Sequence, residues 1–262
     1  MLSFNKIVNK MLKKGGNIIF KEDIFDMIDP EQKEKYQSYV DKTIYRLKAE
    51  KIIIPIKSGV YIIPELGDFD FNEIDLLEKY YLKLLKKYIS FYVGSSYFIS
   101  GKKSLELQLK DYSVPEKISI INRSLNKKIK VGNYEIIFKT ISGNLDGKKI
   151  NLFAKLSSFT DTLSIDSLEF KVASLELALL EASVISIGET GIDINLLNKA
   201  IKKYAKVFKK EVFRELGKYK FIMSFNRLKE LSKNIDKDLY ELFLDIIKQN
   251  GGLFIGEGLR GF

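Results

Sequence analysis

Apolar residues recur at helical spacing within the stretch from residue 33 to residue 64. Val40, Ile44 and Leu47 stand at i, i+4 and i+7, which places them on one face of an α-helix. The positions between them are mostly polar or basic, as expected for a helix with one buried and one exposed side. The pattern therefore predicts a helix from Tyr36 to Glu50.

Two short β-branched runs follow this helix and predict a hairpin. Residues 52–54 and 60–63 have the composition of strands, and Pro64 stops the second one. Between them lies Lys57-Ser58-Gly59, which is typical of a tight turn because glycine adopts a positive φ without strain. The predicted hairpin therefore has a basic tip.

The residues before this helix predict two further helices and a short extended segment. Residues 4–14 carry apolar side chains on one helical face, and a pair of glycines ends that helix. Residues 17–20 are expected to be extended, and residues 21–28 to form a second helix. The order helix, strand, helix, helix, hairpin is that of a winged helix-turn-helix, so we predict this fold for residues 1–66.

A winged helix-turn-helix binds duplex DNA with its third helix in the major groove and its hairpin on the backbone. Side chains that hydrogen-bond base edges or phosphates occupy the predicted helix away from its apolar stripe. The candidate DNA contacts are Lys35, Gln37, Ser38, Tyr39, Lys42 and Arg46 on the helix, with Lys57 and Ser58 at the hairpin tip. The competing interpretation is a solvated amphipathic helix with a hairpin packed behind it.

The rest of the chain predicts a linker and a second domain. Residues 67–90 contain an acidic linker and a connecting helix. Residues 91–262 predict a mixed α/β domain with a small, mostly antiparallel sheet and C-terminal helices. Its expected strands are 117–122, 129–131, 134–140, 151–155 and 168–171, and an apolar helix is expected over 172–182. The fold class predicted for the whole chain is α+β.

A basic stretch occupies residues 195–220, where apolar spacing predicts a helix. Between Lys199 and Lys220 there are nine lysines or arginines and two glutamates. A run of one sign repels itself unless an anion covers it, which indicates a second nucleic-acid contact. The candidates for this contact are Lys202, Lys206 and Lys209. A solvated helix face is the alternative interpretation.

The composition narrows the chemistry of the protein. The 262 residues include no cysteine and no histidine, which removes thiolate chemistry and the commonest general base and metal ligand. The net charge of +10 favours nucleic acid as the partner, although lysine-rich compositions also arise from genome bias. No apolar run is long enough to span a membrane, and the N-terminus lacks the pattern of a signal peptide. We therefore expect a cytoplasmic DNA-binding protein without a cofactor or enzymatic activity.

A metal-dependent nuclease with a winged-helix targeting domain is the alternative function. Glu169-Phe170-Lys171 forms an E-x-K on a predicted strand, with Asp161 and Asp166 upstream. Such carboxylates can hold Mg²⁺ while the lysine assists the attacking water. The motif arises often by chance in a chain this rich in lysine and glutamate, and a surface ion pair is the simpler explanation.

Three stretches, taken in order, resemble the AbiEi family of antitoxins. They are YVDKTIYRLKAEKIIIPIKSGVYII, YFISGKKSLELQLKDYSVPEKISIIN and KVASLELALLEA. Glu176 matches the Glu-Arg-Ala-Leu of the family's third motif, whereas Leu177 stands in place of its arginine. Lys51 likewise stands where the family has glycine before the first strand of the hairpin.

The resemblance implies a transcriptional regulator of a type IV toxin–antitoxin system, the abortive-infection type used in phage defence. The N-terminal winged helix would bind double-stranded DNA at inverted repeats in its own promoter. The C-terminal domain would counteract a co-encoded nucleotidyltransferase-like toxin, and direct contact with that toxin would not be required.

Overall fold

The computed structural model describes residues 3–28, 37–145, 148–184, 191–219 and 221–251 of the chain. They form a mixed α+β fold that divides into two compact units. Unit 1 comprises residues 1–92 and 130–134, and unit 2 comprises residues 93–129 and 135–262. The predicted connecting helix therefore belongs to unit 1. No described helix is both long enough and apolar enough to cross a membrane.

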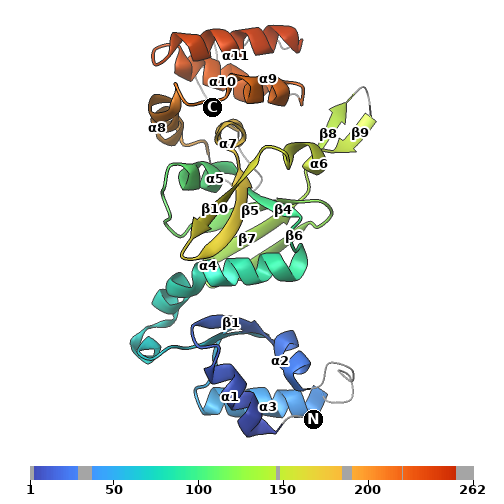
Figure 1. The fold of residues 1–262 in the computed structure, drawn as a ribbon, viewed down its shortest axis with the longest axis vertical. Coiled ribbons are helices and arrows are strands. Elements are labelled where there is room, and N and C mark those ends of the chain that lie inside the picture. The colour runs from blue at the N-terminus through green and yellow to red at the C-terminus, as the bar shows by residue number, and fades with distance from the viewer. Residues whose placement is uncertain (1–2, 29–36, 146–147, 185–190, 220, 252–262) are drawn as a thin grey trace. The chain divides into compact units, whose positions relative to one another are not determined.

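Unit 1 combines helices with a small antiparallel sheet (Figure 1). The three strands are ordered β1-β3-β2. The elements are α1 (Phe4–Leu12), β1 (Asn17–Phe20), α2 (Lys21–Ile28), α3 (Gln37–Ala49), β2 (Ile54–Lys57), β3 (Val60–Ile63), η2 (Asp68–Asp70) and α4 (Glu73–Tyr92). The helix predicted from Tyr36 to Glu50 is confirmed as α3, although Tyr36 itself lies outside the described residues.

The first strand of the hairpin begins later than predicted. The sequence indicated 52–54, but β2 starts at Ile54. The N–H groups of Ile52 and Ile53 donate to the carbonyl of Leu47, at 2.9 and 3.3 Å, and so close the C-terminal end of α3. Lys51 makes this turn possible with a φ of 56°, in the left-handed region that favours glycine. Strand pairing can begin only after this turn is complete.

The apolar stripe of α3 lies in the core of unit 1. Val40, Ile44 and Leu47 are buried, and Ile7 and Met11 of α1 belong to the same cluster. Burial of this stripe leaves the polar side of α3 as its exposed surface. The predicted amphipathic orientation of the helix is therefore confirmed.

The sheet of unit 1 is also covered by α4. The ring of Phe20 on β1 lies 4.9 Å from the ring of Tyr88 and 5.2 Å from that of Phe91, measured between centroids. An ion pair of 2.6 Å joins Lys87 Nζ to Asp23 Oδ1 on α2. These contacts help to explain why side chains on both faces of β1 and β3 are buried, as successive side chains alternate between the two faces.

Unit 2 contains a six-stranded sheet in the order β10-β11-β4-β5-β7-β6, and β8 and β9 form a separate pair. Residues 130–134, around the turn between β6 and β7, are assigned to unit 1. The strands are β4 (Tyr97–Ser100), β5 (Lys117–Asn122), β6 (Lys127–Val131), β7 (Tyr134–Lys139), β8 (Ser142–Leu145), β9 (Lys148–Asn151), β10 (Thr160–Ile165) and β11 (Leu168–Ala173). The helices are α5 (Gly101–Gln108), α6 (Phe153–Leu156), α7 (Leu175–Ala182), α8 (Ile194–Tyr204), α9 (Lys210–Gly217), α10 (Ile222–Ser232) and α11 (Lys237–Gln249).

The large sheet contains parallel as well as antiparallel strand pairs. The pairs β11–β4 and β5–β7 are parallel, whereas β10–β11 and β4–β5 are antiparallel. Figure 1 shows α5 and α7 on the same side of this sheet. Together with the C-terminal helices they enclose the apolar core of unit 2, in which Leu105, Leu177 and Phe243 are fully buried.

Several local predictions in unit 2 are confirmed and others are wrong. The strands expected at 117–122, 129–131, 134–140 and 168–171 correspond to β5, β6, β7 and β11. The strand expected at 151–155 is wrong, because this region contains α6. The helix expected over 172–182 begins only at Leu175, since Val172 and Ala173 still belong to β11.

The basic segment 195–220 is not the single helix that the sequence predicted. It contains α8 and α9, separated by a turn over 205–209. Phe208 is buried in this turn, and the N–H of Lys209 donates to Glu176 Oε1 at 2.8 Å. The burial of the Phe208 ring and the hydrogen bond that Lys209 donates to α7 therefore separate α8 from α9.

Candidate nucleic-acid interface

The outward side of α3 carries a shallow depression. It is lined by Gln37, Ser38, Asp41, Lys42, Tyr45 and Arg46. All six residues are exposed, and they lie on the side of the helix opposite to the buried stripe. The depression thus gathers four of the predicted DNA-binding residues on one surface, which we call the α3 face.

Arg46 is held in place at one end of the α3 face. Its guanidinium carbon lies 3.7 Å from the centre of the Phe4 ring on α1, and Nη2 lies 3.8 Å from Glu50 Oε1. Stacking on an aromatic ring restricts the side chain while its N–H groups stay in the plane of the guanidinium. Arg46 can therefore present a pre-oriented pair of donors to a base edge or a phosphate.

Asp41 is an acidic residue at the centre of the α3 face. Its Oδ1 lies 2.7 Å from Lys21 Nζ on α2, and its Oδ2 accepts a hydrogen bond of 3.0 Å from Gln37 Nε2. These two hydrogen bonds, that from Lys21 first, lower the pKa of Asp41 below its usual value. Asp41 stays ionised at neutral pH and fixes the positions of Lys21 and Gln37.

The remaining predicted residues of the helix differ in their surroundings. Ser38 and Lys42 are exposed on the α3 face. Tyr39 is half-buried and packs against the core of unit 1, so it is turned away from the depression. Lys35 lies outside the described residues.

The predicted hairpin tip is a tight turn with Gly59 at a φ of 76°. Its carbonyl accepts a hydrogen bond of 2.8 Å from the N–H of Lys21, which ties the turn to the start of α2. Ser58 is exposed. Lys57 is also exposed, but its Nζ donates to the carbonyl of Lys130 at 2.8 Å. An incoming phosphate would have to compete with that carbonyl for Lys57.

The three late lysines lie in unit 2. Lys202 is exposed on α8, and Lys209 is exposed at the residue before α9. Lys206 lies in the turn between these helices, where its Nζ is 3.0 Å from Asp236 Oδ2 and 3.9 Å from Asp238 Oδ2. The charge of Lys206 is therefore partly balanced by carboxylates of the protein. The sequence had predicted that all three lysines would be available to nucleic acid.

The E-x-K residues lie on the β10–β11 hairpin. Glu169 is paired with Ser164 across the hairpin, and Lys171 with Thr162. Lys171 Nζ donates to the carbonyl of Ser95 at 3.0 Å, and Asp161 accepts a hydrogen bond of 3.0 Å from Gln108. Among the residues with described positions, no three carboxylates are grouped as a metal site.

Two residues of the α3 face were missed by sequence reasoning. Asp41 and Tyr45 line the depression, although neither is among the predicted DNA contacts. The signal for both was available, since they stand one turn apart on the side opposite to Ile44 and Leu47. Tyr45 is in fact 71% exposed.

Comparison with known proteins assigns no family to the chain. No family model matches it, and no curated protein sequence matches it.

Proposed function

We propose that the protein is a transcriptional regulator that binds duplex DNA through the α3 face. The observation that supports this most strongly is the α3 face itself, where Gln37, Ser38, Lys42 and Arg46 are exposed together on one helix. Amide, hydroxyl and basic side chains are the groups that recognise base edges and phosphates. The alternative is a solvated helix face, on which the stacking of Arg46 on Phe4 would be an ordinary surface contact.

The element order of unit 1 supports the assignment of a winged helix-turn-helix. It runs α1, β1, α2, α3, and then the β2–β3 hairpin, with β1 joining the same sheet. In this fold α3 is the recognition helix and the turn around Ser58 is the wing. The 13 residues of α3 present about three and a half turns, which is enough to follow a major groove.

The two groups of basic residues would do different work. Contacts from the α3 face to base edges would discriminate between sequences. Lys202 and Lys209 of unit 2 would contact phosphates, which adds affinity for any sequence and is weakened by salt. Their exposure in unit 2 supports this second contact, whereas Lys206 is engaged by Asp236.

Anisotropy with labelled duplexes tests this function. One duplex would come from the region upstream of the protein's own gene, the other would be a random sequence of equal length, and the buffer would contain EDTA. We expect the upstream duplex to bind roughly 10³-fold more tightly. The combined substitution Gln37→Ala, Lys42→Ala and Arg46→Ala should remove this preference. Equal affinity of the wild-type protein for both duplexes would contradict the proposal.

We also propose that the regulator serves as the antitoxin of a type IV system and acts in the cytoplasm. The support is the resemblance of the three stretches at 39–63, 97–122 and 171–182 to the AbiEi family. The test is to express a nucleotidyltransferase-like gene from the same neighbourhood alone and together with this protein. Growth should stop in the first case and continue in the second. Failure to restore growth would remove the antitoxin role and leave DNA binding unaffected.

A further inference from the structure

Ser100 and Ser119 lie opposite each other on neighbouring strands of unit 2. They are register partners in the antiparallel pair β4–β5, so their side chains leave the sheet on the same face. Their exposed fractions are only 3% and 5%. Neither hydroxyl has a hydrogen-bond partner among the residues that the structure describes. In the described part of the chain, the side-chain atoms that are fully enclosed without a hydrogen-bond partner are Tyr81 Oη and Glu181 Oε1. The two serine hydroxyls are not among them, so they are open to the space next to them and can bind a ligand there.

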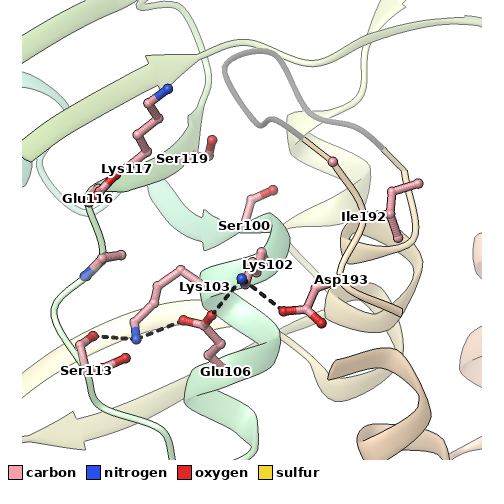
Figure 2. A pocket seen from close by; sticks show the side chains of 12 residues that line it. Ser100, Lys102, Lys103, Glu106, Ser113, Glu116, Lys117, Ser119, Ile192 and Asp193 are labelled. Atoms are coloured by element: carbon pink, nitrogen blue, oxygen red, sulfur yellow. Dashed lines mark hydrogen bonds and ion pairs between the residues drawn. The ribbon is translucent and has the colours of Figure 1, made fainter. Parts of the chain in front are cut away.

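Both serines line a pocket of about 470 Å³ within unit 2 (Figure 2). Its other walls come from the first turn of α5, the segment before β5 and the segment before α8. The volume is in the range of pockets that hold small molecules. The unpartnered hydroxyls therefore face a space that can accept a ligand.

The start of α5 adds hydrogen-bond donors beside the two serines. The N–H of Gly101 donates to the buried carboxylate of Glu181 at 3.2 Å. Helix geometry leaves the N–H groups of Lys102 and Lys103 without a carbonyl partner in the helix, and Ser100 does not cap them. Two hydroxyls and two N–H groups therefore favour a ligand group rich in acceptors, such as a carboxylate or a phosphate.

The charges around the pocket decide between these two groups. Three lysines and three carboxylates line it, namely Lys102, Lys103, Lys117, Glu106, Glu116 and Asp193. Figure 2 shows how four of them form a chain of contacts. Lys103, which is 6% exposed, lies 3.1 Å from Glu106, and Lys102 lies 3.1 Å from Asp193 and 3.7 Å from Glu106.

These ion pairs balance one another, and Glu181 adds a further carboxylate next to α5. A doubly charged phosphate would find no net positive field in such a pocket. A singly charged carboxylate can use the four donors at a much smaller electrostatic cost. The balance of charges thus favours a carboxylate.

We propose that this pocket binds a small carboxylate-bearing molecule, whose carboxylate accepts hydrogen bonds from Ser100 Oγ and Ser119 Oγ. The lysine and acid pairs at the walls provide polar contacts for the rest of the molecule. This site lies beyond the proposed DNA-binding function and does not depend on it.

Isothermal titration calorimetry on the full chain tests the proposal with pyruvate, succinate and L-glutamate as probes and inorganic phosphate for comparison. At least one of the three carboxylates should bind more tightly than phosphate. Ser100→Ala and Ser119→Ala should each weaken this binding about tenfold, because each removes a hydrogen bond to a charged group. The matched control is Ser224→Ala, since Ser224 is equally buried but its hydroxyl donates to the Leu180 carbonyl at 2.9 Å.

The melting temperature without ligand provides a second readout. Ser100→Ala and Ser119→Ala should not lower it, because neither variant loses a hydrogen bond of the unliganded protein. A fall in melting temperature would mean that the hydroxyls are structural and would overturn the proposal. It would also be overturned if none of the three carboxylates bound, if binding survived both substitutions, or if phosphate bound more tightly.

Discussion

The guanidinium of Arg46 on α3 stacks on the ring of Phe4 on α1, at 3.7 Å from its centre. This contact orients an exposed arginine toward the solvent side of the proposed recognition helix. We predict that Arg46→Ala narrows the affinity gap between operator and random duplex, by about 1–3 kcal/mol for one bidentate base contact. Anisotropy on both duplexes measures this gap. Lys48→Ala is the matched control, because Lys48 is an exposed basic residue of α3 outside the α3 face. Equal effects of both substitutions would contradict a base contact by Arg46.

Phosphate contacts by the late lysines should appear in the salt dependence of binding. We predict that Lys202→Ala with Lys209→Ala weakens binding to operator and random DNA alike and flattens the salt slope by about two units, since each lost phosphate contact removes about 0.9. Lys206→Ala should change the slope less, because Asp236 and Asp238 already engage that lysine. A salt series of anisotropy titrations measures the slope. An unchanged slope in the double variant would leave unit 1 as the sole DNA contact.

Asp68 should make the stability of unit 1 depend on pH. Burial raises the pKa of this carboxyl, but hydrogen bonds from Lys79, Tyr80 and the N–H of Glu65 outweigh it and hold the pKa below its usual value of 3.8. The stabilisation is therefore complete above about pH 5 and is lost as the pH falls through the lowered pKa of the folded protein. Denaturant unfolding at a series of pH values measures the loss.

Substitution of Asp68 isolates this contribution. Asp68→Asn should lower the free energy of unfolding at pH 7 by about 1–3 kcal/mol, as expected for hydrogen bonds to a buried charged group. It should also reduce the dependence on pH below about pH 5. Asp70→Asn is the control, because Asp70 is exposed in the same short helix. If the free energy of unfolding of the Asp68 variant fell with pH as much as that of the wild-type protein, other carboxylates would be responsible for the effect.

The E-x-K on β11 should be dispensable. We predict that Glu169→Ala with Lys171→Ala leaves DNA binding unchanged, since Lys171 is engaged with the Ser95 carbonyl on a hairpin of the sheet. Incubation of labelled duplex with the wild-type protein and Mg²⁺ or Mn²⁺ tests the alternative function, a metal-dependent nuclease. Metal-dependent cleavage that disappears in the double variant would establish a nuclease in place of a regulator.

The sequence predicted most of unit 1 because its elements are local. The stripe of Val40, Ile44 and Leu47 specifies a helix and its buried side without reference to the rest of the chain. Gly59 marks a turn through its own backbone freedom. The later start of β2 was not predictable from the β-branched run. The N–H groups of Ile52 and Ile53 donate to the carbonyl of Leu47 at the end of α3, so these residues are not part of the strand.

Unit 2 was predicted less well because its elements depend on distant partners. The basic run at 195–220 has helical periodicity, yet Phe208 and Glu176 divide it into two helices. The turn between these helices also contains Lys206, whose ammonium group forms an ion pair with Asp236. Lys206 is therefore less available to a phosphate than Lys202. Sequence spacing reports which residues share a helix face, but not which residues of other helices neutralise them.

The sequence by itself determined the amphipathic helix at 37–49, the hairpin turn after it, and a surplus of positive charge without histidine or cysteine. These follow from side-chain periodicity and backbone preference within a few residues. Only the tertiary structure decided that Arg46 stacks on Phe4 and that Lys57 donates to the Lys130 carbonyl. It alone brought Ser100 beside Ser119, because strand pairing joins residues whose separation in the chain carries no periodic signal.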